Sequence, residues 1–166
     1  MPESNILSNT LTELPFGLPG RIFRSSMPFG PYDRLNEIWP AYRGNGVSAV
    51  VVLLESQEYL VHARRDLPAF YRSAGLDVIH LPIPDFNIPP DIDALEDAIA
   101  AAIDHAQAGG NLAAHCMAGL GRTGVFMACM AKRHLSLNGA EAIDWVRRHI
   151  PGAMENSLQE QFVIDL

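Results

Sequence analysis

The chain has 166 residues, with 48% hydrophobic and 19% charged residues, which is ordinary for one globular domain that buries its own core. Its formal net charge of −7 argues against a nucleic-acid binder or an anionic-membrane binder, because both partners need a basic surface. Two cysteines are too few for a disulfide framework, and neither a signal peptide nor an apolar run of membrane-spanning length is visible. We therefore expect a reducing, cytoplasmic setting.

The N-terminal quarter of the chain predicts an arm, a strand and a helix. Residues 1–20 are rich in proline, glycine and small polar residues, and they predict an extended arm ahead of a single domain over 21–166. The RIFRSS run at 21–26 predicts a short edge strand before a turn. Asp33 is a suitable start for the helix that follows, with Pro40 kinking or ending it.

Strands and helices alternate through the middle of the chain. Residues 47–54 are continuously apolar and β-branched, which is typical of a strand covered on both faces. One or two helices closed by Gly75 follow, and then a strand over 77–83 that prolines stop. Residues 91–110 predict the clearest helix, capped by Asp91 or Asp93 and ended by two glycines. Its apolar stripe is Ile92, Leu95, Ile99, Ile103 and Ala106.

The last third begins with a short strand over 111–116, and three consecutive helices follow it. This order predicts an α/β fold, a three-layer sandwich in which helices flank a mainly parallel central sheet. Ligand sites in such sheets lie at the carboxyl ends of the strands, where loops meet helix N-termini. The stretch HCMAGLGRTG, His115 to Gly124, occupies such a strand–loop–helix position.

The composition of this stretch indicates an anion site. Small residues with glycine at 119 and 121 allow consecutive backbone N–H groups to turn inward as a nest. The helix that begins near Thr123 adds the positive end of its dipole. Arg122 has the planar fork that grips two oxygens of a tetrahedral oxyanion.

Cys116 lies within this positive field, so we expect its thiol to ionise more readily than a free thiol. We expect Thr123 to donate a hydrogen bond to the sulfur and His115 to orient the loop. A nucleophile under a phosphate cradle implies in-line attack on phosphorus and a phosphocysteine intermediate, with no metal and no cofactor. The alternative is a buried structural cysteine before an ordinary turn.

The loop resembles the signature His-Cys-x5-Arg-[Ser/Thr] of the cysteine-dependent protein tyrosine and dual-specificity phosphatases. The phosphate-binding positions here are Met117, Ala118, Gly119, Leu120, Gly121 and Arg122. The resemblance extends over roughly residues 20–166, and it implies a sheet flanked by helices, two-step phosphomonoester hydrolysis and a general acid on a separate mobile loop. The RIFRSSMP segment is similar to one in small bacterial members of the family, which suggests that Arg24 and Ser25 approach the site.

In the family the general acid is an aspartate on a loop before the signature. Asp85, in LPIPDFNIPP, is 31 residues before Cys116 and is the only carboxylate between the preceding strand and the next helix. The resemblance therefore implies that Asp85 is the acid, and that it acts as base on water in the second step. Asp91 and Asp93 compete for this role but fit helix capping better.

The C-terminal AMENSLQEQF stretch resembles one that positions the hydrolytic water in several relatives, and the choice stays open between Glu155, Asn156 and Gln159. Cys129 is interpreted as a buried apolar residue, with a thiol that protects Cys116 as a disulfide as the alternative. The pair Arg64–Arg65 is interpreted as a solvated helix face rather than a reader of acidic substrates. The six histidines show no metal-ligand spacing.

The expected partner is a phosphorylated protein, with phosphotyrosine and then phosphoserine or phosphothreonine as the group removed, or a small phosphomonoester. Met117, Ala118 and Leu120 are uncharged, which disfavours polyphosphoinositide headgroups. No Asn-Arg-Tyr-like segment is present, which predicts a shallow pocket. Phosphoinositide hydrolysis, a non-catalytic pseudophosphatase and a thiol-dependent oxyanion reductase or sulfurtransferase stay open as alternatives.

Overall fold

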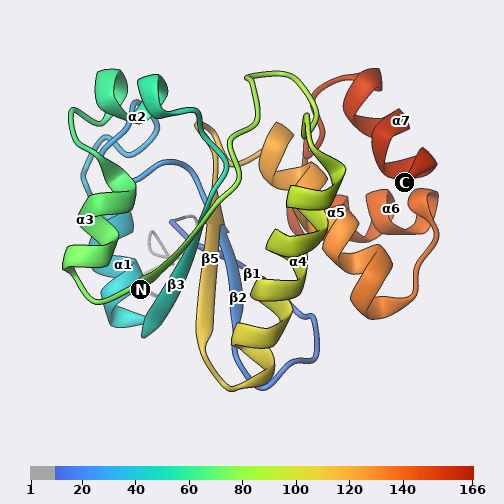
Figure 1. Cartoon of the computed structure of the whole chain (residues 1–166), viewed down its shortest axis with the longest axis horizontal. Helices are drawn as coiled ribbons and strands as arrows, with labels where there is room; N and C mark the ends of the chain where they lie inside the picture. The colour runs from blue at the N-terminus through green and yellow to red at the C-terminus, as the bar shows by residue number, and fades with distance from the viewer. Residues whose placement is uncertain (1–9) are drawn as a thin grey trace, which may run out of the picture.

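A computed structural model of the chain describes residues 10–166 and shows one five-stranded sheet between two layers of helices (Figure 1). The strand order is β1-β2-β5-β3-β4; β1 runs antiparallel to β2, and all other neighbours are parallel. The predicted mainly parallel sheet is therefore confirmed. The strands are β1 (Thr12–Leu14), β2 (Ile22–Ser25), β3 (Val47–Val52), β4 (Asp77–His80) and β5 (Asn111–His115).

Two hydrophobic cores lie on opposite faces of this sheet, as the three-layer prediction requires. Three helices cover one face: α1 (Ile38–Gly44), α2 (Ser56–His62) and α3 (Leu67–Ser73) (Figure 1). Four cover the other: α4 (Ile92–Gln107), α5 (Gly121–Leu135), α6 (Gly139–His149) and α7 (Ser157–Asp165). The predicted run of three C-terminal helices is confirmed. None of the helices within residues 10–166 is long and apolar enough to cross a bilayer.

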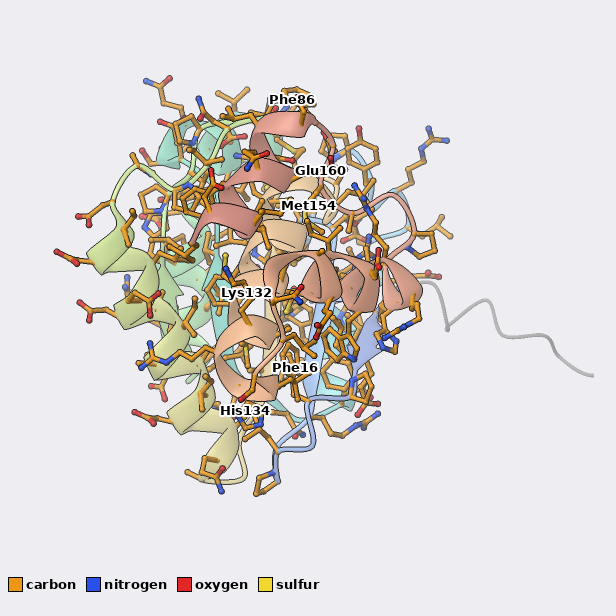
Figure 2. The ribbon with its side chains drawn as sticks, turned by 90° about the vertical axis from the view of Figure 1, so that its right-hand side faces the viewer. Phe16, Phe86, Lys132, His134, Met154 and Glu160 are labelled. Carbon is orange, nitrogen blue, oxygen red and sulfur yellow. The ribbon has the colours of Figure 1, made fainter. Side chains whose placement is uncertain are left out.

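The prediction that the strand at 21–26 is an edge strand is wrong. β2 pairs with β5 on one side and with β1 on the other. β1 comes from the segment expected to be an arm, and Leu14 and Phe16 are buried in the core. Phe16 packs edge-on against Trp145 of α6, near His134 (Figure 2). An alternation of only three strand residues is too short to stand out in the sequence.

The helix expected to start at Asp33 begins at Ile38. The Asp33 carboxylate instead accepts hydrogen bonds from the backbone N–H groups of Phe29 (2.8 Å) and Glu37 (2.9 Å), so it closes the turn before the helix. Pro40 neither kinks nor ends α1, because it lies in the first turn, where the missing N–H would have no partner within the helix.

The N-cap of α4 is one of the two aspartates that the sequence offered. The Asp91 side chain accepts a hydrogen bond from the Ala94 N–H at 3.1 Å, so Asp91 and not Asp93 is the N-cap. Ile92 does not belong to the buried stripe, since it is 52% exposed at the first turn. The buried positions are Leu95, Ala98, Ile99, Ala102 and Ala106.

Candidate active site

The stretch from His115 to Gly124 forms the turn between the end of β5 and the N-terminal half of α5. Gly119 has φ +76°, and a Cβ there would lie 2.3 Å from the carbonyl oxygen of Ser25, so only glycine fits. The turn forms one wall of a pocket of about 90 Å³. The pocket is lined by Tyr32, Asp85, Phe86, Cys116, Met117, Ala118, Gly121, Arg122, Glu155 and Gln159.

Arg122 is held in this pocket by acceptors from two distant segments. Its side chain is only 2% exposed, and it donates from both terminal nitrogens to the Glu58 carboxylate at 2.8 and 2.9 Å. It also donates to the carbonyl oxygen of Ile83 at 2.9 Å. Burial acts to lower the pKa of Arg122, but the hydrogen bond to Glu58 and the charges of Cys116, Glu58 and Asp85 outweigh it and hold this pKa above its ordinary value.

Asp85 lies beside Arg122. Its Oδ1 is 3.1 Å from a terminal nitrogen of Arg122, and its side chain is half exposed. The competing carboxylates, Asp91 and Asp93, do not line the pocket. The structure thus gathers Cys116, Arg122 and Asp85 around one small cavity.

His115 is fully buried behind the loop. Its Nδ1 lies 3.2 Å from the Cys116 carbonyl oxygen, which only accepts, so Nδ1 carries the proton and Nε2 accepts from the Tyr71 hydroxyl at 2.9 Å. Burial lowers the pKa of His115 to about 4, despite the opposing hydrogen bond to Cys116. A neutral imidazole with both nitrogens engaged supports the loop-orienting role and not that of a base.

The hydrogen bond expected from Thr123 to the sulfur is not formed in the part of the chain that the structure describes. Thr123 Oγ1 is buried, and within residues 10–166 it has no hydrogen-bond partner. Its assignment to the site stays a proposal. Cys116 and Cys129 are both free thiols; burial raises the pKa of Cys129 to about 12, which agrees with its interpretation as a buried residue of α5.

The three candidates for water positioning lie in different surroundings. The Gln159 side chain is buried, accepts from the Glu155 N–H at 2.8 Å and donates to the Asn87 carbonyl at 3.1 Å. Asn156 caps α7 and donates to the Phe86 carbonyl at 2.8 Å, but it does not line the pocket. Two amide side chains therefore tie the loop that follows Asp85 to the start of α7.

Three features of the site have no counterpart in the sequence prediction. Glu58 is one, and the others are Tyr32 and Phe86, which line the pocket while 65% and 61% exposed. Phe86 lies near the start of α7, at the top of the view in Figure 2. Arg24, which the family resemblance places near the site, donates to two carbonyls of the phosphate loop.

The other sequence candidates lie outside the pocket. The prediction of a helix face is wrong for Arg64 and Arg65, because α2 ends at His62 and both residues lie before α3. Arg65 stacks over the ring of Phe29 at 3.7 Å, and neither it nor the exposed Arg64 lines the cavity. Within residues 10–166 no group of three or more His, Cys, Asp or Glu side chains is placed to hold a metal ion.

A cysteine and an arginine on a strand–loop–helix turn, with an aspartate opposite, define the class of the cysteine-dependent phosphatases. Residues 30–135 match the profile of a family described as "Polymorphic toxin system, DSP-PTPase phosphatase", and the chain belongs to this dual-specificity and tyrosine phosphatase family.

Relatives and solved structures agree with this assignment. The chain is 30% identical over 141 residues to the human dual specificity protein phosphatase CDC14C. The aligned region spans 85% of this chain but only 29% of that protein. It is 32% identical to Tk-PTP, solved in its active form, with a TM-score of 0.71 and coverage of 88% and 90% of the two chains. The structure of kinase associated phosphatase shares the fold, with a TM-score of 0.82, 18% identity and coverage of 92% and 90%.

Proposed function

We propose that the chain hydrolyses phosphomonoesters of proteins through a phosphocysteine intermediate. The observation that carries the proposal is the convergence of Cys116, Arg122 and Asp85 on one cavity of about 90 Å³. A phosphate-binding module needs a cradle and an arginine, but it needs neither a thiol nor an acid. A thiol-dependent reductase or sulfurtransferase needs no aspartate beside the arginine.

In the first step the Cys116 thiolate attacks phosphorus in line with the ester oxygen, and the sulfur–phosphorus bond forms as the phosphorus–oxygen bond breaks. Asp85, entering the step as the carboxylic acid, gives its proton to the leaving oxygen. Arg122 and the loop amides stabilise the charge on the equatorial oxygens. The bidentate contact with Glu58 keeps the guanidinium in place for this.

In the second step the Asp85 carboxylate takes a proton from a water molecule, and that water attacks phosphorus. The phosphorus–sulfur bond breaks, which returns the thiolate and releases inorganic phosphate. Glu155 and Gln159 line the pocket and are the candidates for holding this water. Both amide atoms of Gln159 are already hydrogen-bonded, so we favour Glu155.

The rim of the pocket favours phosphotyrosine. Tyr32 and Phe86 both line the cavity with their side chains exposed, and aromatic walls suit an aryl phosphate ester. The human relative's description as a dual specificity protein phosphatase supports a phosphoprotein substrate. The uncharged Met117 and Ala118 disfavour a polyphosphoinositide headgroup.

The proposal includes a reducing, cytoplasmic setting, because the reaction needs Cys116 as a free thiolate. Cys116 and Cys129 are free in the structure, which supports this setting. The net charge of −7 supports a partner that is neither a nucleic acid nor an anionic membrane.

The test is turnover of aryl phosphates by the full chain and by Cys116→Ser and Asp85→Asn, with Asp93→Asn as a matched control on a carboxylate outside the pocket. We expect no turnover by Cys116→Ser. For Asp85→Asn we expect a loss of about 10²–10⁴-fold that shrinks as the leaving group becomes more acidic. Asp93→Asn should match wild type.

A wild-type protein without vanadate-sensitive hydrolysis, yet able to bind phosphate, would establish a pseudophosphatase instead. Comparison of phosphotyrosine and phosphoserine peptides with phosphoinositide vesicles decides the substrate. Faster turnover of the lipid would refute the phosphoprotein proposal. An equal rate for tyrosine and serine peptides would refute the aromatic preference.

A further inference from the structure

The carbonyl groups of the phosphate loop are anchored to one neighbouring segment. The Met27 N–H donates to the carbonyl oxygen of Met117 at 3.0 Å. The Arg24 guanidinium donates to the carbonyl oxygens of Gly119 at 3.0 Å and Ala118 at 3.4 Å. Three successive peptide units of the loop are therefore held through their oxygen ends.

The sheet order explains why this segment lies behind the loop. β2 runs parallel to β5, with Ser25 opposite His115, so both strands end at the same edge (Figure 1). Ser25 is itself fixed by hydrogen bonds of its Oγ to the Tyr42 hydroxyl and to the Ser26 carbonyl, both at 2.7 Å. Arg24 therefore acts from a strand of the sheet, and Met27 lies two residues past the end of that strand.

Anchoring the oxygens fixes the direction of the amides. In a trans peptide unit the N–H points opposite to the C=O. The units whose oxygens belong to Met117, Ala118 and Gly119 carry the N–H groups of the next residues, at positions 118, 119 and 120. These N–H groups therefore point away from the 24–27 segment.

Arg24 also brings charge to the loop. It is only partly exposed, and burial lowers its pKa while the charges of Cys116 and Tyr42 act to raise it. An arginine stays protonated in proteins, so a second cation besides Arg122 acts on the charge of the nucleophile.

We propose that Arg24 is a positioning residue of the phosphatase reaction, which holds the amides of the phosphate loop toward the oxyanion and stabilises the Cys116 thiolate. The proposal rests on the proposed function, since it assigns a means of tuning the same site. Arg24 acts from behind the loop, whereas Arg122 lines the phosphate pocket.

The test compares Arg24→Met, which keeps the length without the donors or the charge, with Arg24→Lys, which keeps the charge without the planar fork. Arg21→Met is the matched control, because Arg21 immediately precedes the same strand but pairs with Glu13 at the surface. The probes are the rate of Cys116 alkylation by iodoacetamide between about pH 5 and 9, and protection against alkylation by vanadate. Neither probe requires turnover.

We expect Arg24→Met to move the midpoint of the alkylation profile up by about one pH unit and to weaken vanadate protection about tenfold. Arg24→Lys should keep the midpoint close to that of wild type and weaken protection at least about threefold, because one ammonium cannot serve both carbonyls in the same geometry. Arg21→Met should match wild type in both measurements.

A folded Arg24→Met with the wild-type midpoint and wild-type vanadate protection would overturn the proposal. If thermal unfolding shows that Arg24→Met does not fold, Arg24→Lys decides, and undiminished vanadate protection overturns the proposal. Failure of the proposed function looks different: wild type would then show no aryl-phosphate turnover at all, while the alkylation and vanadate results would still report on Arg24.

Discussion

Replacing Glu58 by glutamine tests how the structure holds the phosphate clamp. The carboxylate makes two hydrogen bonds to Arg122, at 2.8 and 2.9 Å, and also accepts from the backbone N–H of Glu55 at 2.9 Å. Glutamine keeps the size and one oxygen acceptor but removes the charge and one of the two parallel bonds. The 2% exposure of Arg122 leaves its guanidinium little access to water as a substitute.

The magnitude follows from this burial. Removing one partner of a fully buried ion pair costs about 3–5 kcal/mol. Glutamine retains an acceptor, and the Glu58 side chain is 18% exposed, so we expect a loss of about 1–3 kcal/mol in the free energy of unfolding. Because the guanidinium loses its fork-to-fork alignment, we also expect kcat/KM for aryl phosphates to fall about 10- to 100-fold.

Urea unfolding followed by fluorescence gives the first quantity, and steady-state kinetics gives the second. Glu55→Gln is the control, because Glu55 is the N-cap of α2 and shares the capping box with Glu58 but is not hydrogen-bonded to Arg122, so it isolates the capping effect. If Glu58→Gln matched Glu55→Gln in both stability and kcat/KM, the assignment of Glu58 as the support of Arg122 would be refuted.

Three further outcomes are expected. Burial lowers the pKa of His115 to about 4 from an unfolded value of 6.5. The neutral form therefore contributes about 3 kcal/mol to the free energy of unfolding, which is complete above pH 6.5 and is lost as pH falls toward 4. The free energy of unfolding of His115→Gln, measured with urea, should lack this part of the pH dependence. A slope against pH that equals that of wild type between pH 6.5 and 4 contradicts this prediction. Gly119→Ala should lose at least about tenfold in vanadate affinity, because its Cβ would meet the Ser25 oxygen at 2.3 Å; wild-type vanadate inhibition contradicts it. Asn156→Ala frees the Phe86 carbonyl, and kcat should fall about 3- to 10-fold for poor leaving groups only. An equal fall for activated esters would show that this contact does not act through proton transfer from Asp85.

The phosphate loop could be predicted from the sequence because the residues that carry its chemistry follow one another in the chain. Strand, small residues, arginine and helix follow one another between His115 and Gly124, and a local pattern fixes their arrangement. Asp85 could be proposed only through the family resemblance, as the one carboxylate between a strand and the next helix, 31 residues before Cys116. The interior strand β3 is equally clear from the sequence, because a run of β-branched residues has few alternatives.

The partners that come from distant segments could not be predicted. Glu58 is 64 residues from Arg122 in sequence, and only the packing of α2 beside the loop brings them together. The position of β2 inside the sheet depends on strand order, which no local pattern encodes. The sequence named Asn156 and Gln159 as candidates for water positioning, but the structure engages their side chains with the loop after Asp85.

The charges around the pocket explain why binding and proton transfer are coupled in the proposed mechanism. Three carboxylates, Glu58, Asp85 and Glu155, together with a Cys116 thiolate exceed the two cations Arg122 and Arg24 by two charges. A phosphate dianion entering this site competes with Asp85 for Arg122 and adds two more negative charges. Protonation of Asp85 relieves both conflicts at once, because it frees the guanidinium and removes a charge. In the proposed mechanism Asp85 therefore enters the first step as the acid, and proton transfer to the leaving oxygen restores the carboxylate that the second step needs.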